Sequence, residues 1–80
     1  MTRLEIFDLL KDIFVDVFDD ETIEISDQTT AKDIDNWDSL VHIHLIMGIE
    51  RSFGVKFTMS EVDSMKNVGI MADVIEAKLG

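Results

Sequence analysis

Asp35-Asn36-Trp37-Asp38-Ser39-Leu40 marks the point where an acidic segment gives way to an apolar one with helical spacing. We expect a helix from about residue 38 or 39 to 53, with Asp38 as its N-cap and Gly54 as its C-terminal stop. A helix start exposes free backbone N–H groups and a partial positive charge, which favour an anion such as a phosphate. Ser39 is therefore either a simple cap or the place where a phosphate-linked group is attached.

Three further helices are predicted around this one. Two capping-box patterns, Thr2 with Glu5 and Thr58 with Glu61, mark helix starts, and Asn67 can cap the last helix. The expected bounds of these three helices are about 2–18, 58–65 and 67–79. The side chains expected to face the core are Leu4, Phe7, Leu10, Phe14 and Val17, then Leu45, Ile46, Ile49 and Phe53, then Val68, Met71, Val74, Ile75 and Leu79.

The segment 19–38 shows no sustained helical period, although a helical turn near 30–35 remains open. Ile23, Ile25 and Ile34 are expected to pin this long loop to the core. No pair of strands is predicted. The fold class is therefore all-α: a small four-helix bundle of three main helices and one short one, forming a single domain over residues 1–80.

Composition narrows the possible functions. The formal charge of the 80 residues is −10, and residues 16–38 hold nine acids against one base, Lys32. This field disfavours nucleic acid and anionic lipid, and it favours basic partner surfaces. The chain has no cysteine, so disulfides and thiolate zinc sites are excluded. It also has no long apolar run and no signal-peptide layout, so we expect a cytoplasmic protein without membrane insertion.

The second helix carries more apolar surface than one buried face requires. Leu40, Ile43 and Met47 cluster on the side opposite its inward residues, beside His44 and Arg51. A surface helix needs only one buried face, so this second face either packs under another element or contacts a partner. Of the five methionines, only Met47 is a good candidate for such an interface, and the others are expected mainly to fill the core or start the chain.

With these elements placed, the chain resembles an acyl carrier protein over nearly all its 80 residues. The resemblance rests on Asp38-Ser39-Leu40 at a helix start after a long acidic loop, followed by the apolar helix, Glu50, and Phe53-Gly54-Val55. The resemblance implies a 4′-phosphopantetheine arm, joined to Ser39 by a phosphodiester and installed from coenzyme A by a phosphopantetheinyl transferase. Asp38 would cap the helix and assist loading, and Trp37 would flank the arm.

The resemblance also implies a carrier that performs no chemistry itself. Acyl or aminoacyl groups would be held as thioesters and presented to loading and processing enzymes with basic or apolar docking surfaces. The side chains expected to meet these enzymes are Leu40, Val41, Ile43, His44, Met47 and Arg51. No catalytic residue and no metal ligand is predicted, and the protein is expected to be a monomer.

The sequence departs from the carriers of fatty acid biosynthesis, many of which have Gly-Ala-Asp-Ser-Leu-Asp at this site. Asn36 and Trp37 precede Asp38 here, Val41 replaces the last acid, and His44 stands where an acid is usual. This pattern is more similar to discrete carriers of polyketide, nonribosomal peptide, specialised lipid or polysaccharide-modification pathways.

One alternative function remains open at this stage. The chain could be a non-covalent acidic helical module that binds partners through Leu40, Ile43 and Met47. Calcium binding by the acidic loop is disfavoured because its spacing fails the EF-hand pattern. His42 projects near the inward residues, and is either a hydrogen-bonded core histidine or a polar group lining an acyl cavity.

Overall fold

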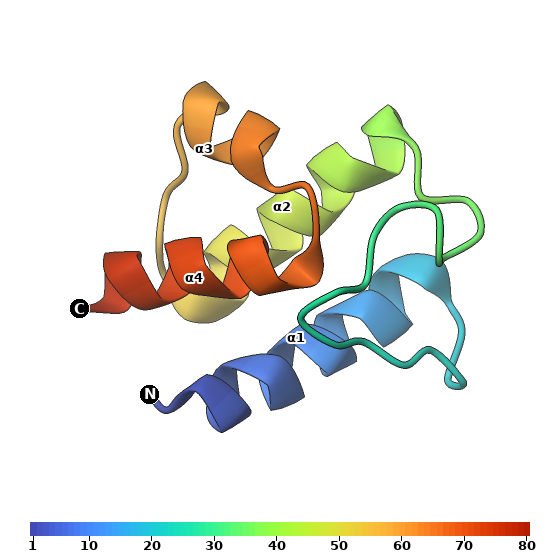
Figure 1. The fold of residues 1–80 in the computed structure, drawn as a ribbon, viewed down its shortest axis with the longest axis horizontal. Helices are drawn as coiled ribbons and strands as arrows, with labels where there is room; N and C mark the ends of the chain where they lie inside the picture. Colours follow the sequence, from blue (N-terminus) through green and yellow to red (C-terminus); the bar gives the residue numbers. More distant parts are fainter.

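The computed structural model describes all 80 residues and contains four α-helices and no strand. Their bounds are α1 Arg3–Phe18, α2 Ser39–Phe53, α3 Met59–Ser64 and α4 Val68–Leu79. Helices α2 and α4 both pack against α1, and the short α3 bridges α2 and α4 (Figure 1). The predicted all-α fold with three main helices, one short helix and a long first loop is confirmed. None of the helices has the length and apolar character needed to cross a membrane.

Local signals in the sequence set the helix boundaries correctly. Both predicted capping boxes form, because each threonine hydroxyl accepts the third backbone N–H while the glutamate reaches back to the threonine N–H. Asp38 and Asn67 cap α2 and α4, because their side-chain oxygens accept the backbone N–H groups of Val41 and Ile70. Gly54 ends α2 in the left-handed conformation, with φ of 69°, which a residue without Cβ adopts without strain.

Two residues that were predicted to face the core are exposed to solvent. Leu4 is 74% exposed and Leu79 is 40% exposed, whereas both were expected to face inward. Leu4 lies about 120° around the helix from the buried Leu10, while Ile6 lies only about 40° from it and is fully buried. Leu79 is the last residue of α4. The buried hydrophobic residues missing from the prediction are Ile6, Ile13 and Ala72, whereas Met65 is buried, as expected of most methionines in this chain.

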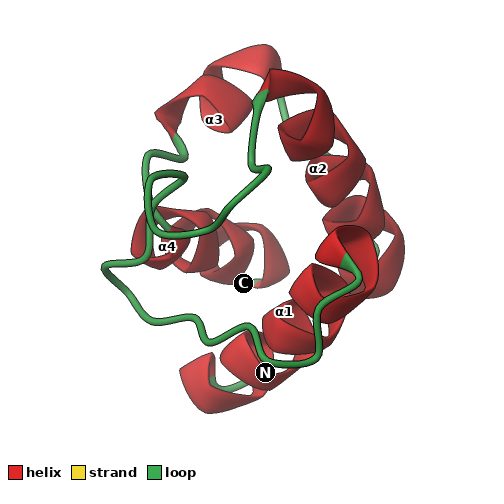
Figure 2. Cartoon of the chain, turned by 90° about the vertical axis from the view of Figure 1, so that its right-hand side faces the viewer, coloured by secondary structure: helices red, strands yellow, loops and turns green.

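The long loop is held against the first turn of α4 by its backbone. The N–H of Val68 donates to the Thr29 carbonyl and the N–H of Gly69 to the Asp27 carbonyl, each at 2.9 Å. These bonds satisfy two of the N–H groups that a helix start leaves free. Figure 2 shows the loop, in green, running from the end of α1 across to α4. Ile23 and Ile34 are buried and Ile25 is half-buried, as predicted, while residues 31–36 form turns and no helix.

Arg3, the first residue of α1, bonds both to this loop and to α4. Its guanidinium donates to the carboxylates of Asp27 in the loop and of Asp73 and Glu76 in α4, and also to the Gly69 carbonyl at 3.3 Å. Hydrogen bonds to these carboxylates, that of Asp27 foremost, raise the pKa of Arg3 further above its ordinary value. One cation therefore links α1, the loop and α4 in a region of negative charge.

The close approach of the loop makes Gly69 intolerant of a side chain. A Cβ added at Gly69 would lie 2.6 Å from the backbone oxygen of Asp27, whereas one at Gly48 would meet only the Ile13 Cγ2 atom at 3.3 Å. We predict that Gly69→Ala lowers the free energy of unfolding by about 1–3 kcal/mol, because the loop must move away. Gly48→Ala should change it by less than about 1 kcal/mol, since a helix-propensity gain offsets a mild contact. Urea unfolding of both variants checks this, and equal stability of the two would contradict it.

Candidate functional site at the start of α2

Ser39 is the first residue of α2, and its side chain is exposed. The Asp38 carboxylate accepts the N–H of Val41 at 2.9 Å, so Asp38 is the N-cap. The Ser39 hydroxyl makes no hydrogen bond within the protein, and the alternative in which Ser39 serves as the cap is therefore wrong. Asn36 enters the turn with φ of 70°, and its carbonyl accepts the Asp38 N–H at 3.1 Å. Asparagine tolerates this left-handed conformation better than most residues.

Trp37 anchors the end of the loop in a cluster of aromatic rings. Its ring meets Phe14 and Phe18 of α1 edge-on, with centroids 5.4 and 6.1 Å away, and lies beside the His42 ring, with centroids 5.9 Å apart. Its Nε1–H also donates to Nδ1 of His42 at 3.2 Å. Such aromatic pairs are favourable beyond the area that they bury, so Trp37 fixes the loop just before Asp38 and Ser39.

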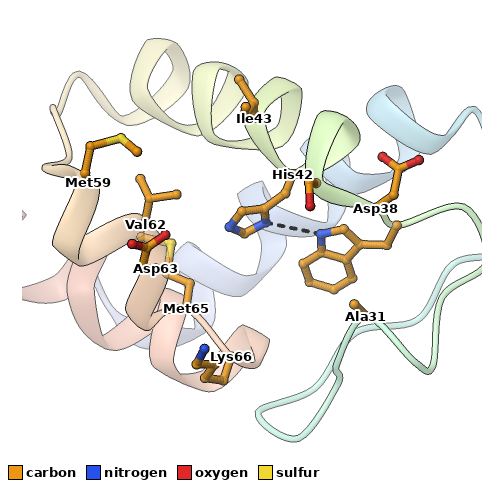
Figure 3. A pocket seen from close by; sticks show the side chains of 11 residues that line it. Ala31, Asp38, His42, Ile43, Met59, Val62, Asp63, Met65 and Lys66 are labelled. Carbon is orange, nitrogen blue, oxygen red and sulfur yellow. Dashed lines mark hydrogen bonds between the residues drawn. The ribbon is translucent and has the colours of Figure 1, made fainter.

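A groove of about 490 Å³ opens beside Ser39, between the start of α2, the loop and α3 (Figure 3). Trp37, Asp38, Ser39, His42 and Ile43 come from the loop end and α2. The remaining lining residues are Ala31, Met59, Val62, Asp63, Met65 and Lys66. The structure thus brings Ser39, Asp38, Trp37 and Ile43, all predicted site residues, together with His42 at one groove.

Polar contacts outside the groove hold its α3 wall in place. Lys78 at the end of α4 forms a 2.9 Å ion pair with Glu61 of α3. This pairing, reinforced by the Thr58 N–H, lowers the pKa of Glu61 below its ordinary value. The Glu50 carboxylate accepts the Phe57 N–H at 2.8 Å and so fixes the link from α2 to α3. The α3 wall therefore stands at a defined distance from α2.

The other predicted partner residues lie along the outer side of α2. Leu40, Ile43 and Met47 are between 51% and 65% exposed, so this second apolar face is not covered by another element. Val41 is half-buried, and His44 and Arg51 are exposed. A second groove, of about 560 Å³, separates this face from α1, and its lining residues are Ile13, Asp16, Val17, Val41, His44, Met47, Gly48, Arg51 and Ser52. Ile43 lies on the Ser39 groove instead, so the predicted face borders both grooves.

Comparison with known proteins identifies the family. Residues 8–75 match the family described as the phosphopantetheine attachment site. The chain belongs to the acyl carrier protein family. It is 33% identical to an acyl carrier protein of Coprothermobacter proteolyticus over 79 residues, covering 99% of this chain and 96% of the relative. It is 30% identical to an acyl carrier protein of Thermotoga maritima over 79 residues, covering 99% and 98% of the two chains.

The fold agrees with that of a solved carrier. The solution NMR structure of a holo acyl carrier protein from Geobacter metallireducens superposes with a TM-score of 0.86 at 45% identity, covering 91% of this chain and 84% of that one. The chain is thus an acyl carrier protein whose cofactor is a covalently bound phosphopantetheine. Its family consists of carriers rather than catalysts, and its members work with phosphopantetheinyl transferases and acyl-processing enzymes.

The residues around Ser39 fit such a group. The hydroxyl is exposed and free of internal hydrogen bonds, and the backbone N–H groups of Ser39 and Leu40 have no acceptor within the protein. A phosphate on Ser39 would lie at the positive end of the α2 dipole. The neighbouring groove offers both apolar walls and polar groups, which suits an arm that contains amide bonds.

Sequence reasoning missed the α3 side of this site. Met59, assigned mainly to the core, is 77% exposed and lines the groove, and Val62, Asp63 and Lys66 were not singled out. The capping box at Thr58 was the available signal, because it fixes where α3 begins and hence which residues share a face. The sequence alone did not predict that this face of α3 would lie opposite α2.

Replacing Asp38 tests whether its side-chain oxygen stabilises α2 as a cap. Asp38→Ala should lower the free energy of unfolding by about 0.5–2 kcal/mol, because the Val41 N–H loses its acceptor. Asp38→Asn keeps a side-chain oxygen and should stay within a few tenths of a kcal/mol of the parent protein. Thermal unfolding followed by circular dichroism measures both. Asp38→Asn as unstable as Asp38→Ala would show that the carboxylate charge, and not the cap, stabilises the helix.

Proposed function

We propose that Ser39 carries the 4′-phosphopantetheine arm of this carrier and that the groove beside Ser39 receives the arm and its acyl or aminoacyl cargo. The observation that supports this most directly is the exposed Ser39 hydroxyl at the N-terminus of α2, with no internal hydrogen bond and with the cap supplied by Asp38. The arm would come from coenzyme A through a phosphopantetheinyl transferase. The protein holds its cargo as a thioester for partner enzymes and performs no chemistry of its own.

Loading tests the attachment site. Ser39→Ala should abolish the gain of one phosphopantetheinyl group when the protein is incubated with coenzyme A, magnesium and a broad-specificity transferase, as read by intact mass. Its free energy of unfolding should change by less than about 0.5 kcal/mol, because the hydroxyl has no partner in the fold. Ser52→Ala, on the exposed last turn of α2, is the matched control and should load normally. Loading that persists in Ser39→Ala would contradict the assignment.

We also propose that the outer face of α2 is the docking surface for these enzymes, with Leu40 and Met47 at its centre. Both side chains are more than half exposed. Leu40 directly follows Ser39 and Met47 stands about two turns further along α2, where a partner acting on the cargo must approach. His44 and Arg51 make this face less acidic than the loop, so apolar contact carries a larger share of recognition than charge. This balance supports service in a dedicated lipid, polyketide, peptide or polysaccharide-modification pathway.

A charge placed on this face tests the docking surface. Met47→Glu should raise the Kd or KM for the transferase by at least about fivefold, or about 1 kcal/mol, a cost that only a minority of interface residues reach. Stability should hold, because Met47 is 51% exposed and a carboxylate at position 47 stands four residues before Arg51, a favourable helical spacing. Leu4→Glu introduces the same charge at an exposed leucine of α1 and should leave the KM unchanged. Equal effects of both variants would indicate a general charge effect and contradict a local surface.

A further inference from the structure

We infer that the His42 ring is a hydrogen-bond donor aimed at an acceptor oxygen of the group carried on Ser39. This inference rests on the proposed attachment at Ser39 and specifies the ligand chemistry of the groove. His42 follows Ser39 by three residues, about one helical turn. It lines the groove together with Ser39 and Ile43.

Trp37 determines which nitrogen of His42 carries the proton. An indole N–H can only donate, and the Trp37 Nε1 atom lies 3.2 Å from Nδ1 of His42. Nδ1 must therefore be the unprotonated, accepting nitrogen of a neutral ring. The proton of that ring then resides on Nε2. The planes of the two rings differ by 29°, so the indole N–H and the Nδ1 lone pair, which each lie in their own ring plane, can point at each other.

The protonated nitrogen faces the groove and is free to bond a ligand. Figure 3 shows Nε2 on the side of the ring away from Trp37, toward the wall formed by Met59 and Val62. No hydrogen bond joins Nε2 to a protein atom, and no buried side-chain nitrogen or oxygen lacks a partner. Nε2 is therefore accessible from the groove, where water or a ligand oxygen can accept its proton.

The surroundings make this donor selective. Six of the eleven residues that line the groove are hydrophobic, and Met59 and Val62 lie across the groove from the His42 ring. A hydrocarbon chain laid there would displace water from Nε2 without replacing its hydrogen bond, which is unfavourable. A ligand with an oxygen at that point would replace it. The groove therefore favours an amide carbonyl of the arm, or an oxo or hydroxyl group of the cargo, next to His42.

NMR of the loaded protein tests this with three defined probes. Phosphopantetheine alone, and the same arm with octanoyl or 3-oxooctanoyl joined through a stable amide, are attached to the full chain, and loading is verified by mass. The reporter is the ¹⁵N resonance of His42 Nε2, with the unloaded protein as reference. Before loading, the spectrum should show the Nε2–H tautomer, and Trp37→Phe should allow a mixture of tautomers.

The probes distinguish the two sources of oxygen. A change at Nε2 with the arm alone identifies the arm as the source of the acceptor oxygen, and a change seen only with an acyl group attached identifies the cargo. An unchanged Nε2 resonance with all three loaded probes, or an Nδ1–H tautomer in the free protein, would overturn the inference while leaving Ser39 as the attachment site. Absence of loading at Ser39 would overturn both.

Substitutions of His42 supply a second readout. The probe that shifts Nε2 should also raise the melting temperature, and His42→Phe should abolish that rise, because it keeps a ring beside Trp37 but has no donor. His42→Gln, which can accept from Trp37 and donate into the groove, should restore part of it. The double variant Trp37→Phe with His42→Phe removes both partners and controls for an orphaned Trp37 N–H. A rise that is undiminished in His42→Phe would contradict the inference.

Discussion

The docking of the long loop on the first turn of α4 is the contact on which the rest of the structure depends. Residues 19–38 contain no helix, and they are held by two backbone hydrogen bonds from Val68 and Gly69 and by the ion pair of Asp27 with Arg3, which also pairs with α4. This docking needs a residue without a side chain at position 69, because the Asp27 carbonyl occupies the space of a Cβ. The loop is thereby held in a fixed position between α1 and the start of α2.

The fixed loop also determines where Asp38 and Ser39 lie. From its attachment at α4 the loop continues through the buried Ile34 to Trp37, whose ring is wedged against α1 and against His42. Asp38 and Ser39 follow at once, so the position of the exposed hydroxyl is set by packing on both sides of it. Chain segments that carry function are commonly loops positioned by a rigid scaffold, and here the scaffold includes the loop itself.

The sequence was most informative where the signal is local. Capping boxes, Asp38, Asn67 and Gly54 define helix ends through contacts within a few residues, and all were predicted correctly. Core faces were harder, because the apolar residues of α1 support two overlapping periodic sets, and only the packing of α2 and α4 selects the one that contains Ile6 rather than Leu4. Contacts between distant segments, such as Arg3 with Glu76, have no local signature.

The difference between local signals and distant contacts also explains which parts of the site could be predicted. Asp38-Ser39-Leu40 at a helix start is a local pattern, so the attachment residue could be proposed from sequence. The groove is a property of three segments brought together, and its α3 wall depends on the Lys78–Glu61 pair, which joins residues 17 positions apart. His42 depends on both a local pattern and a contact made by the loop. Its spacing placed it near the inward residues, but its bond to Trp37 follows from the loop anchor, and that bond converts an ambiguous core histidine into a ring with a defined donor.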